Sequence, residues 1–453
     1  MSNIIPEIED IVKFYTPEEI EEIARETGFV QRESKLGGVE FLGLMTQGLY
    51  SNPNATLNQM AGMVKDINPD VEISGPGIHQ RIVGTGRDFL KEMLSRSMQL
   101  SVSHIIPEDI SGILSGFARV HLLDSTQTSL PPELSERWGG SGGSASTAGM
   151  KIQLMLDYKS GQYEKIVIEE GKSADQSYMK EAVKLLGSGE LMIYDLGYFD
   201  TNCMIDIAAK GSYFLSRFNH RAGLYRKKED GTFEKFDLEK ELKKAYKKGQ
   251  TRCEFTVWLC KDGRELEIRL VAERVPEEVA NRRRSKAKKV AKKKGRKPTK
   301  KHLYMQNWSL YITNAGEDKL PAEAVSVVYR IRWYIEIVFK SWKSYHGLDQ
   351  VRGEREERIE CFIYGRLIMM VIMTFLFGSI KRHVWQTKGR EASLLKVIGH
   401  FHDKAKKMLC VITDLKAFAR ILYAEFFEAC RLCLMDSRKR LSTAQKVRLA
   451  NAA

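Results

Sequence analysis

Two aspartates of this sequence stand where metal-dependent chemistry could be built. Asp124 follows the apolar run Val120 to Leu123, and Asp195 follows the apolar run Leu191 to Tyr194. Both runs are typical of buried strands, whose carboxyl ends reach the rim of an α/β sheet where sites form. Taken singly, each aspartate has the more ordinary interpretation of a turn or cap residue. A third carboxylate that joins them would favour a site.

Glu336 is that third carboxylate, in the helical stretch after Pro321. Tyr329, Arg332, Glu336 and Lys343 lie at offsets of 0, 3, 7 and 14 residues. At ~100° per residue, the four share an arc of ~60° on one helix face. A solvated face of a plain amphipathic helix is the alternative. One acid flanked by two cations and a phenol suits a phosphate backbone that leads into a metal site.

The pattern Tyr329-x2-Arg332-x3-Glu336-x6-Lys343 resembles the Y-R-E-K signature of DDE-class cut-and-paste insertion-sequence transposases. In that family the signature follows two catalytic aspartates. The second opens a D-x-G-Y/F motif, matched by Asp195-Leu196-Gly197-Tyr198-Phe199, and Asp124 matches the first by position. The resemblance covers about residues 55–400. It implies a ribonuclease H-like α/β core, with a mixed sheet and helices, interrupted by an all-β insertion and flanked by helical N- and C-terminal domains.

The resemblance also implies the chemistry. Asp124, Asp195 and Glu336 would be catalytic and would bind two Mg²⁺ or Mn²⁺ ions, for which carboxylates are suitable hard ligands. Two ions can activate a nucleophile and stabilise a leaving oxygen. Water would free a 3′-OH at the transposon end, and this 3′-OH would form a hairpin that is later reopened and joined to target DNA. Arg332 and Lys343 would bind phosphates.

Three further residues are candidates for DNA binding. Tyr329 would add a hydrogen bond to the phosphates. The family places a tryptophan upstream of the signature, where it supports a base moved out of the stack, and Trp308 occupies that position. A core tryptophan on a strand is the alternative. Arg217, after the strand-like run Tyr213 to Ser216, is a further candidate phosphate contact.

The positive charge of the chain is concentrated in one segment. The net charge is +14, and thirteen Lys or Arg lie between Arg282 and Lys301 without any acid, so the rest of the chain carries 14 − 13 = +1. This favours an anionic partner, most often nucleic acid, and a DNA-contacting arm. A solvated arm or a targeting signal is the alternative. With 43% apolar residues, the chain is not disordered as a whole.

Five regions follow from the changes in texture. Residues 1–105 are predicted to be a helical domain that binds DNA ends, with a helix starting at Pro17 and a third helix near Ile78. His79, Gln80 and Arg81 at the front of that third helix suggest a helix-turn-helix, or equally an ordinary helical hairpin. Residues 106–220 are the first part of the core, 221–320 the β insertion with its basic arm, 321–395 the second part of the core, and 396–453 a helical domain for oligomerisation.

The cysteines and apolar segments bear on location. Seven cysteines, an odd number, do not make a disulfide framework, and Cys430 and Cys433 are interpreted as buried thiols rather than a zinc site. The apolar run Leu367 to Phe377 is too short to span a membrane and predicts a core helix. Without a signal sequence, we expect a cytoplasmic, nucleoid-associated prokaryotic protein. Its partners would be double-stranded DNA, as terminal inverted repeats and target, and a second copy in a paired-end complex.

Two alternatives stay open on the sequence alone. The same fold serves structure-specific nucleases and other recombinases, which cut DNA without joining paired ends. An inactive DNA-binding derivative is the other, although the presence of all three acids disfavours it.

Overall fold

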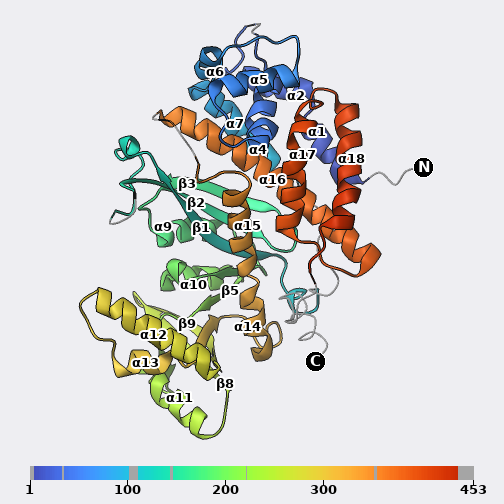
Figure 1. Cartoon of the computed structure of the whole chain (residues 1–453). Helices are drawn as coiled ribbons and strands as arrows, with labels where there is room; N and C mark the ends of the chain where they lie inside the picture. The colour runs from blue at the N-terminus through green and yellow to red at the C-terminus, as the bar shows by residue number, and fades with distance from the viewer. Residues whose placement is uncertain are drawn as a thin grey trace. The chain divides into compact units, whose positions relative to one another are not determined.

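The computed structural model describes residues 5–32, 35–100, 111–142, 146–220, 222–350, 353 and 355–436. The described residues form two compact units. The first unit contains those within 1–107, 124–173 and 333–439, and the second those within 108–123 and 174–332. Strand β1 (Val120–Leu130) is divided between the two after Leu123. Figure 1 shows the chain coloured along its length.

The first unit begins with seven helices, as the sequence predicts for its N-terminal region. Pro17 starts α2, and the Thr56 side chain accepts a hydrogen bond from Gln59 N to cap α5. The third predicted helix starts at Gly75 rather than near Ile78, because Ser74 caps it, and it ends after Arg81. A π-helical turn, Leu44–Gly48, joins α3 to α4. The helices are α1 (Pro6–Phe14), α2 (Pro17–Glu26), α3 (Gly38–Gly43), α4 (Leu49–Ser51), α5 (Leu57–Ile67), α6 (Gly75–Arg81) and α7 (Gly84–Ser97).

The first unit also holds a β-hairpin and the four helices from the end of the chain. Strand β2 (Ala148–Asp157) is buried along its whole length and pairs antiparallel with β3 (Tyr163–Glu170). The strand order in this unit is β3-β2-β1, and a short 3₁₀ turn, Pro132–Leu134, follows β1. The helices are α15 (Trp333–Ser344), α16 (Glu356–Lys388), α17 (Leu394–Leu409) and α18 (Leu415–Leu432).

Helices from the two ends of the chain pack against each other, an arrangement that no local sequence pattern predicts. Tyr15 and Phe418 make an edge-to-face ring contact at 5.5 Å. Ile5 N donates to the Tyr423 hydroxyl at 2.6 Å, and α1 and α18 lie side by side in Figure 1. The predicted separate N- and C-terminal helical domains therefore share one apolar core, because each helix has an apolar face that the other covers.

Helix α16 is the one described helix with the length and composition to cross a membrane. In the structure, 94% of its most apolar window is buried inside the protein. Such burial is typical of a core helix, which agrees with the interpretation of Leu367 to Phe377. The predicted run is part of a much longer helix of 33 residues.

The second unit is built on a mixed sheet. The first four residues of β1 pair parallel with β4 (Leu191–Tyr194), and β4 pairs parallel with β5 (Tyr213–Arg217). Strand β10 (Trp308–Thr313) is antiparallel to both β5 and β9 (Arg264–Arg274). The order in this unit is β1-β4-β5-β10-β9-β8-β6-β7, with β8 (Arg252–Lys261), β6 (Tyr225–Lys227) and β7 (Phe233–Lys235) at its end. The mixed sheet with helices agrees with an α/β core.

Two sequence predictions need correction here. The strand predicted to end at Asp124 continues to Leu130, since β1 pairs in both units. The region 221–320 is not all-β, because three of the helices of this unit lie within it, and its strands extend the sheet through β10. The helices are α8 (Ser111–Leu114), α9 (Asp175–Leu185), α10 (Thr201–Ala209), α11 (Leu238–Lys247), α12 (Glu277–Lys293), α13 (Lys300–Met305) and α14 (Ala322–Arg330).

Candidate active site

Three parallel strands end in one row in the second unit. Leu123 is paired with Tyr194, and Tyr194 with Ser216, so the three residues lie side by side across β1, β4 and β5. Asp195 and Arg217 are the next residues on β4 and β5. Asp124 directly follows Leu123 in the chain. The predicted meeting of strand ends at one rim of the sheet is therefore present in the hydrogen-bond register.

Asp195 is held in place by its own motif. Its Oδ1 accepts a hydrogen bond from Gly197 N at 2.7 Å, and it caps the short 3₁₀ turn Leu196–Tyr198. A Cβ on Gly197 would lie 3.0 Å from Asp195 Oδ1 and also 3.0 Å from Asp175 Oδ2. A larger residue would crowd both carboxylates, which gives the glycine of the D-x-G motif a steric reason.

Asp175 is a carboxylate that sequence reasoning missed. It is the first residue of α9, and its Oδ2 lies beside Gly197 and so near the Asp195 carboxylate. An acid in the first turn of a helix is ordinarily a dipole or cap contact, which is why the sequence did not single it out. The β4–α9 arrangement alone brings it to this rim.

Tyr329 has charged neighbours in the second unit. Its ring lies 5.2 Å from that of Tyr311 and 6.0 Å from the guanidinium carbon of Arg332. Burial raises the pKa of Tyr329 to about 12, and the positive charges of Arg332 and Arg217 oppose this rise while the Asp195 carboxylate adds to it. The phenol is therefore protonated at neutral pH and can donate a hydrogen bond, with two cations and one acid close by.

The signature does not lie on one continuous helix, contrary to the prediction. Helix α14 ends at Arg330, a turn takes in Ile331 and Arg332, and α15 begins at Trp333. The Arg332 N–H bonds to Tyr329 O, three residues back, so the α-helical ladder is interrupted. The common ~60° face computed for an unbroken helix therefore applies only to Glu336 and Lys343, which share α15.

Glu336, Lys343 and Asp124 belong to the first unit. Lys343 Nζ donates to the backbone oxygen of Gln127 on β1 at 3.0 Å. From this contact, Asp124 is three residues back along β1, ~10 Å, and Glu336 seven residues back along α15, ~10.5 Å. The Asp124 Oδ1 accepts from Ser125 N at 2.9 Å. Both carboxylates are partly exposed to solvent.

Buried aromatic residues fix α15 in the first unit. Trp342 lies 6.0 Å from Tyr163 and 5.1 Å from Phe339, ring centre to ring centre. The Tyr163 hydroxyl is 2.6 Å from Thr374 Oγ1 on α16. These contacts hold the face opposite to the solvent, so that the orientation of Glu336 on α15 is set by core packing.

The acids do not form a ready metal cluster. In the described part of the chain, no group of three or more His, Cys, Asp or Glu side chains is close enough to hold a metal ion. The chemistry of the donors nevertheless fits magnesium, since Asp124, Asp195 and Glu336 are all carboxylates and Asp175 stands near the second.

The two tryptophans near the signature differ in exposure. Trp308, the predicted base-stacking residue, is 2% exposed on β10, and its indole nitrogen has no hydrogen-bond partner. Its burial favours the core interpretation, because a stacking surface must be reachable by a base. Trp333 was missed, although it precedes Glu336 by three residues and so shares its helix face; it is 59% exposed.

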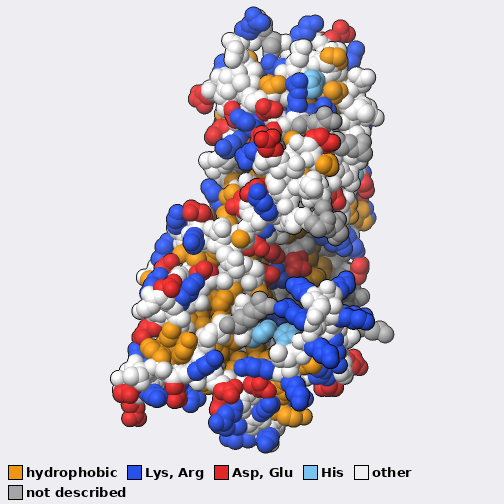
Figure 2. Space-filling view, turned by 90° about the vertical axis from the view of Figure 1, so that its left-hand side faces the viewer, with side chains coloured by type: hydrophobic (Ala, Val, Ile, Leu, Met, Phe, Trp, Pro, Cys, Tyr) orange, Lys and Arg blue, Asp and Glu red, His pale blue; other side chains and the backbone are white. Residues whose placement is uncertain are grey.

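The basic run is largely helical. It lies on α12 and α13, and Figure 2 shows Lys and Arg side chains gathered over the part of the molecule where α11 to α13 lie. Two of the arginines have structural partners: Arg283 donates to Trp308 O at 3.2 Å and to Ser309 Oγ at 3.1 Å, and Arg284 bonds to Asn307 Oδ1. The lysines of α12 are exposed.

The helix-turn-helix candidate loses one of its readers. The Arg81 guanidinium donates to the backbone oxygens of Phe29 and Leu36 and lies 4.0 Å from the Phe29 ring centre. Arg81 therefore tethers the N-terminal helices. All seven cysteines are free thiols, and Cys430 and Cys433 are buried, in keeping with the interpretation of the C-x-x-C pair.

Comparisons with known proteins point to one family. Residues 115–372, which include the three acids, match the family described as "Transposase DDE domain". The transposase for insertion sequence element IS231F of Bacillus thuringiensis subsp. israelensis is 31% identical over 413 residues, covering 88% of this chain and 85% of the relative. The IS1151 transposase of Clostridium perfringens is 28% identical and covers 84% of this chain and 82% of its own length.

Proposed function

Because this chain belongs to the DDE-domain transposase family of insertion sequences, we propose that it binds terminal inverted repeats, nicks the transposon end and joins it to target DNA. The observation that carries the proposal is the row of strand ends. Leu123, Tyr194 and Ser216 lie in register, and the residues that follow them are Asp124, Asp195 and Arg217. Two acids and a cation at one rim suit the transfer of a phosphoryl group.

We assign catalysis to Asp124, Asp195 and Glu336. Family members use divalent metal ions, most often Mg²⁺, and two such ions held by these carboxylates would supply nucleophile activation and stabilisation of the leaving oxygen. The carboxylates themselves orient water for attack on phosphorus, which breaks the P–O3′ bond and frees a 3′-OH. The equal distances of Asp124 and Glu336 from the Lys343–Gln127 hydrogen bond support this assignment.

We assign phosphate binding to Arg217, Arg332 and Lys343, with a hydrogen bond from Tyr329. The support is the charge around Tyr329, whose pKa responds to both Arg217 and Arg332. In this proposal the freed 3′-OH attacks the opposite strand to give a hairpin, which is reopened before joining. Trp308 is the base platform by family position, and Trp333 is the candidate that its exposure supports.

The remaining assignments concern partners and place. The proposal includes a homodimer that holds two ends together, with residues 1–105 at the DNA ends. It places the protein in the cytoplasm with the nucleoid. The acid-free basic segment Arg282 to Lys301 supports DNA as the partner.

The decisive experiment compares nicking with binding. Asp124→Asn, Asp195→Asn and Glu336→Gln should each lower Mg²⁺-dependent nicking of a duplex with the element's terminal sequence by more than about a thousandfold. The affinity for the same duplex, measured without metal, should change less than about threefold, since each residue supplies a metal ligand and not an anchor. Glu323→Gln, an exposed acid on α14, serves as the matched control.

The outcomes separate the alternatives. Near wild-type nicking by any one of the three variants would remove that residue from the site. Nicking without joining of paired ends by the wild-type protein would identify a nuclease. DNA binding with no metal-dependent nicking would identify an inactive derivative.

A further inference from the structure

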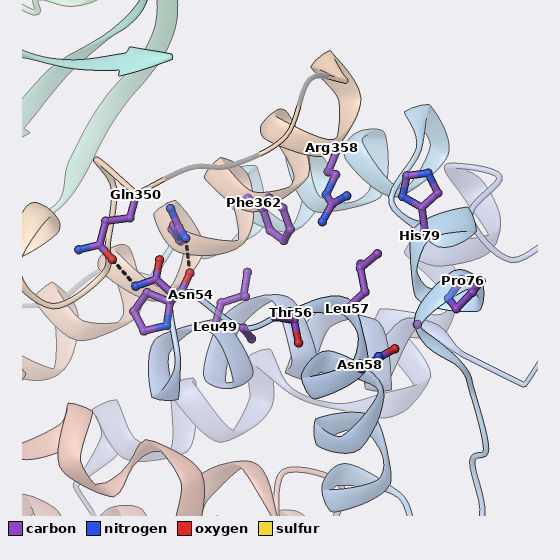
Figure 3. A pocket seen from close by; sticks show the side chains of 14 residues that line it. Leu49, Asn54, Thr56, Leu57, Asn58, Pro76, His79, Gln350, Arg358 and Phe362 are labelled. Atoms are coloured by element: carbon purple, nitrogen blue, oxygen red, sulfur yellow. Dashed lines mark hydrogen bonds between the residues drawn. The ribbon is translucent and has the colours of Figure 1, made fainter. Parts of the chain in front are cut away.

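A pocket of about 720 Å³ lies in the first unit, apart from the residues assigned to catalysis. Figure 3 shows it from close by. It lies between the segment that leads from α4 into α5, the start of α6, and the first turns of α16. The described residues that line it include two arginines and a histidine but no aspartate or glutamate: Leu49, Pro53, Asn54, Ala55, Thr56, Leu57, Asn58, Gly75, Pro76, His79, Gln350, Arg358, Phe362 and Arg366.

Arg366 is a fixed cation at this pocket. It is 3% exposed, and its guanidinium donates to the backbone oxygens of Gly347 and Pro53. Its Nε is buried without a hydrogen-bond partner. Burial lowers the pKa of Arg366 to about 10, against the opposing effect of Asp349, so the side chain remains charged at neutral pH. A buried cation held only by carbonyl oxygens is incompletely compensated.

Arg358 is the second cation, and it points into the pocket between Phe362, Leu57 and His79 in Figure 3. Its guanidinium carbon lies 5.5 Å from the Phe362 ring centre, and within the described ranges its Nε is buried without a hydrogen-bond partner. Burial lowers its pKa. His79 Nδ1 is likewise buried without a partner. Three polar groups that face one pocket without partners favour an anionic ligand.

The rest of the lining fits more than a bare anion. Leu49, Leu57 and Phe362 form an apolar wall, and Asn54 and Asn58 bring amides to the rim. The volume lies within the range of ~300–1,000 Å³ typical of pockets that enclose small organic groups. A phosphate joined to a flat, partly apolar ring with polar edges matches cations, wall and amides together.

We propose that this pocket binds one nucleotide of the DNA, with its phosphate on Arg358, Arg366 and His79 and its base or sugar against Phe362 and Leu57. The inference rests on the proposed function, since DNA is taken as the partner. It adds a contact site distinct from the acids and from the exposed basic helix. A free nucleotide carries the same chemistry, and the experiment separates the two sources.

The test uses the full-length protein and fluorescence anisotropy with a labelled duplex of the terminal sequence. Arg358→Gln should weaken duplex binding by about tenfold and reduce the salt slope by about one, as expected when one phosphate is no longer neutralised. His79→Gln should weaken it by about threefold. Arg355→Gln removes the same charge from the exposed residue that precedes α16, outside the lining, and should change affinity by less than about twofold. Melting curves check that all variants are folded.

Each result decides the matter. Equal duplex affinity for Arg358→Gln and Arg355→Gln would overturn the proposal. So would Arg358-dependent binding of deoxyadenosine 5′-monophosphate with unchanged duplex affinity, which would identify a free-nucleotide site. Protection of Arg358 from phenylglyoxal by the duplex in the wild-type protein tests the contact without any variant, and absence of protection counts against it. Loss of metal-dependent nicking by the wild-type protein would contradict the proposed function and not the pocket.

Discussion

Asp195 shows how neighbouring groups, in addition to residue type, make a side chain a candidate ligand. The Gly197 N–H fixes one of its oxygens at 2.7 Å, and the absence of a side chain on Gly197 leaves room for Asp195 and Asp175 together. Tyr329 and two arginines surround the same rim in the second unit. A fixed carboxylate with cations beside it is suited to a phosphate and a metal ion, because neither partner has to be reorganised on binding.

The two tryptophans give a prediction at the same scale. Trp308→Ala should lower the free energy of unfolding by ~3–5 kcal/mol, since a buried indole is removed from β10. Trp333→Ala should change stability by less than ~0.5 kcal/mol, because the side chain is 59% exposed. If Trp333 stacks on a displaced base, its loss should spare the first nick and slow the next step by about tenfold.

Urea unfolding and single-turnover assays of the two steps measure these effects. An end that already lacks the displaced base should recover part of the loss in Trp333→Ala. A Trp308→Ala protein that is as stable as wild type but slow only in the second step would return the stacking role to Trp308.

Helix α12 belongs to the scale of elements. Its arginines Arg283 and Arg284 are engaged with β10 and the residue before it, whereas its lysines face solvent. The element is therefore a helix attached by one side that presents charge on the other. This division of roles is what a DNA-contacting arm requires, because the arm needs both a fixed base and free cations.

Replacing the exposed lysines of α12 by glutamine should weaken binding to all duplexes alike. The salt slope should fall by ~0.9 for each phosphate that the helix no longer neutralises. The lysines are Lys286, Lys288, Lys289, Lys292 and Lys293. Titration of duplex affinity against salt concentration measures the slope, and five lysine-to-glutamine changes on α11, away from α12, provide the control. An unchanged slope would show that α12 does not contact DNA.

His346, just after α15, predicts a pH effect on the first unit. It is 1% exposed, stacks on Tyr50 at 4.7 Å, and neither ring nitrogen has a partner. Burial, with smaller effects from His402 and Arg366, lowers the pKa of His346 to about 3. Between pH ~6.5 and about 3 the unfolded chain binds a proton that the folded chain does not, so stability falls as the pH falls.

His346→Phe should flatten this dependence by up to ~1.4 kcal/mol per pH unit in that window. Urea unfolding of wild type and variant at several pH values measures it. Carboxylates titrate equally in both proteins, so the difference isolates His346. His220→Phe, a change at an exposed histidine of the second unit, is the control. Parallel curves for wild type and His346→Phe would show that His346 is not held neutral.

On the scale of the whole molecule, the first unit is closed by helices from both ends of the chain. Glu7 pairs with Arg382, and Tyr15 packs on Phe418. The C-terminal helices therefore cannot be an appended oligomerisation module alone. They complete a core that the N-terminal helices cannot close by themselves.

Truncation after Lys388 tests this point. It removes α17 and α18, whose buried side chains include Phe401, Phe418, Leu422 and Phe426, each worth ~1.5–3 kcal/mol of burial. This exceeds a typical net stability of ~5–15 kcal/mol once their partners are exposed as well, so the first unit should not fold. Circular dichroism and thermal melts measure it. Truncation after Asp436 removes none of the described helices and should fold, whereas a folded, cooperatively melting chain without α17 and α18 would contradict the shared core.

The sequence by itself determined the local features. Apolar runs placed β4 and the start of β1, and a capping threonine with proline placed the start of α2. The order of Asp124, Asp195, Tyr329, Arg332, Glu336 and Lys343 indicated the family that the comparisons then showed. These features are legible because they depend on residues close together in the chain, where periodicity and motif spacing act directly.

Tertiary structure alone decided the features that depend on distant partners. The strand predicted to end at Asp124 runs on to Leu130 because β2 is there to pair with it, and the predicted single helix breaks at Arg332. The burial of Trp308, the tethering of Arg81 and the pocket beside Arg358 arise from packing between segments far apart in sequence. No local pattern encodes these, because a side chain's exposure and charge balance are set by whatever the fold brings against it.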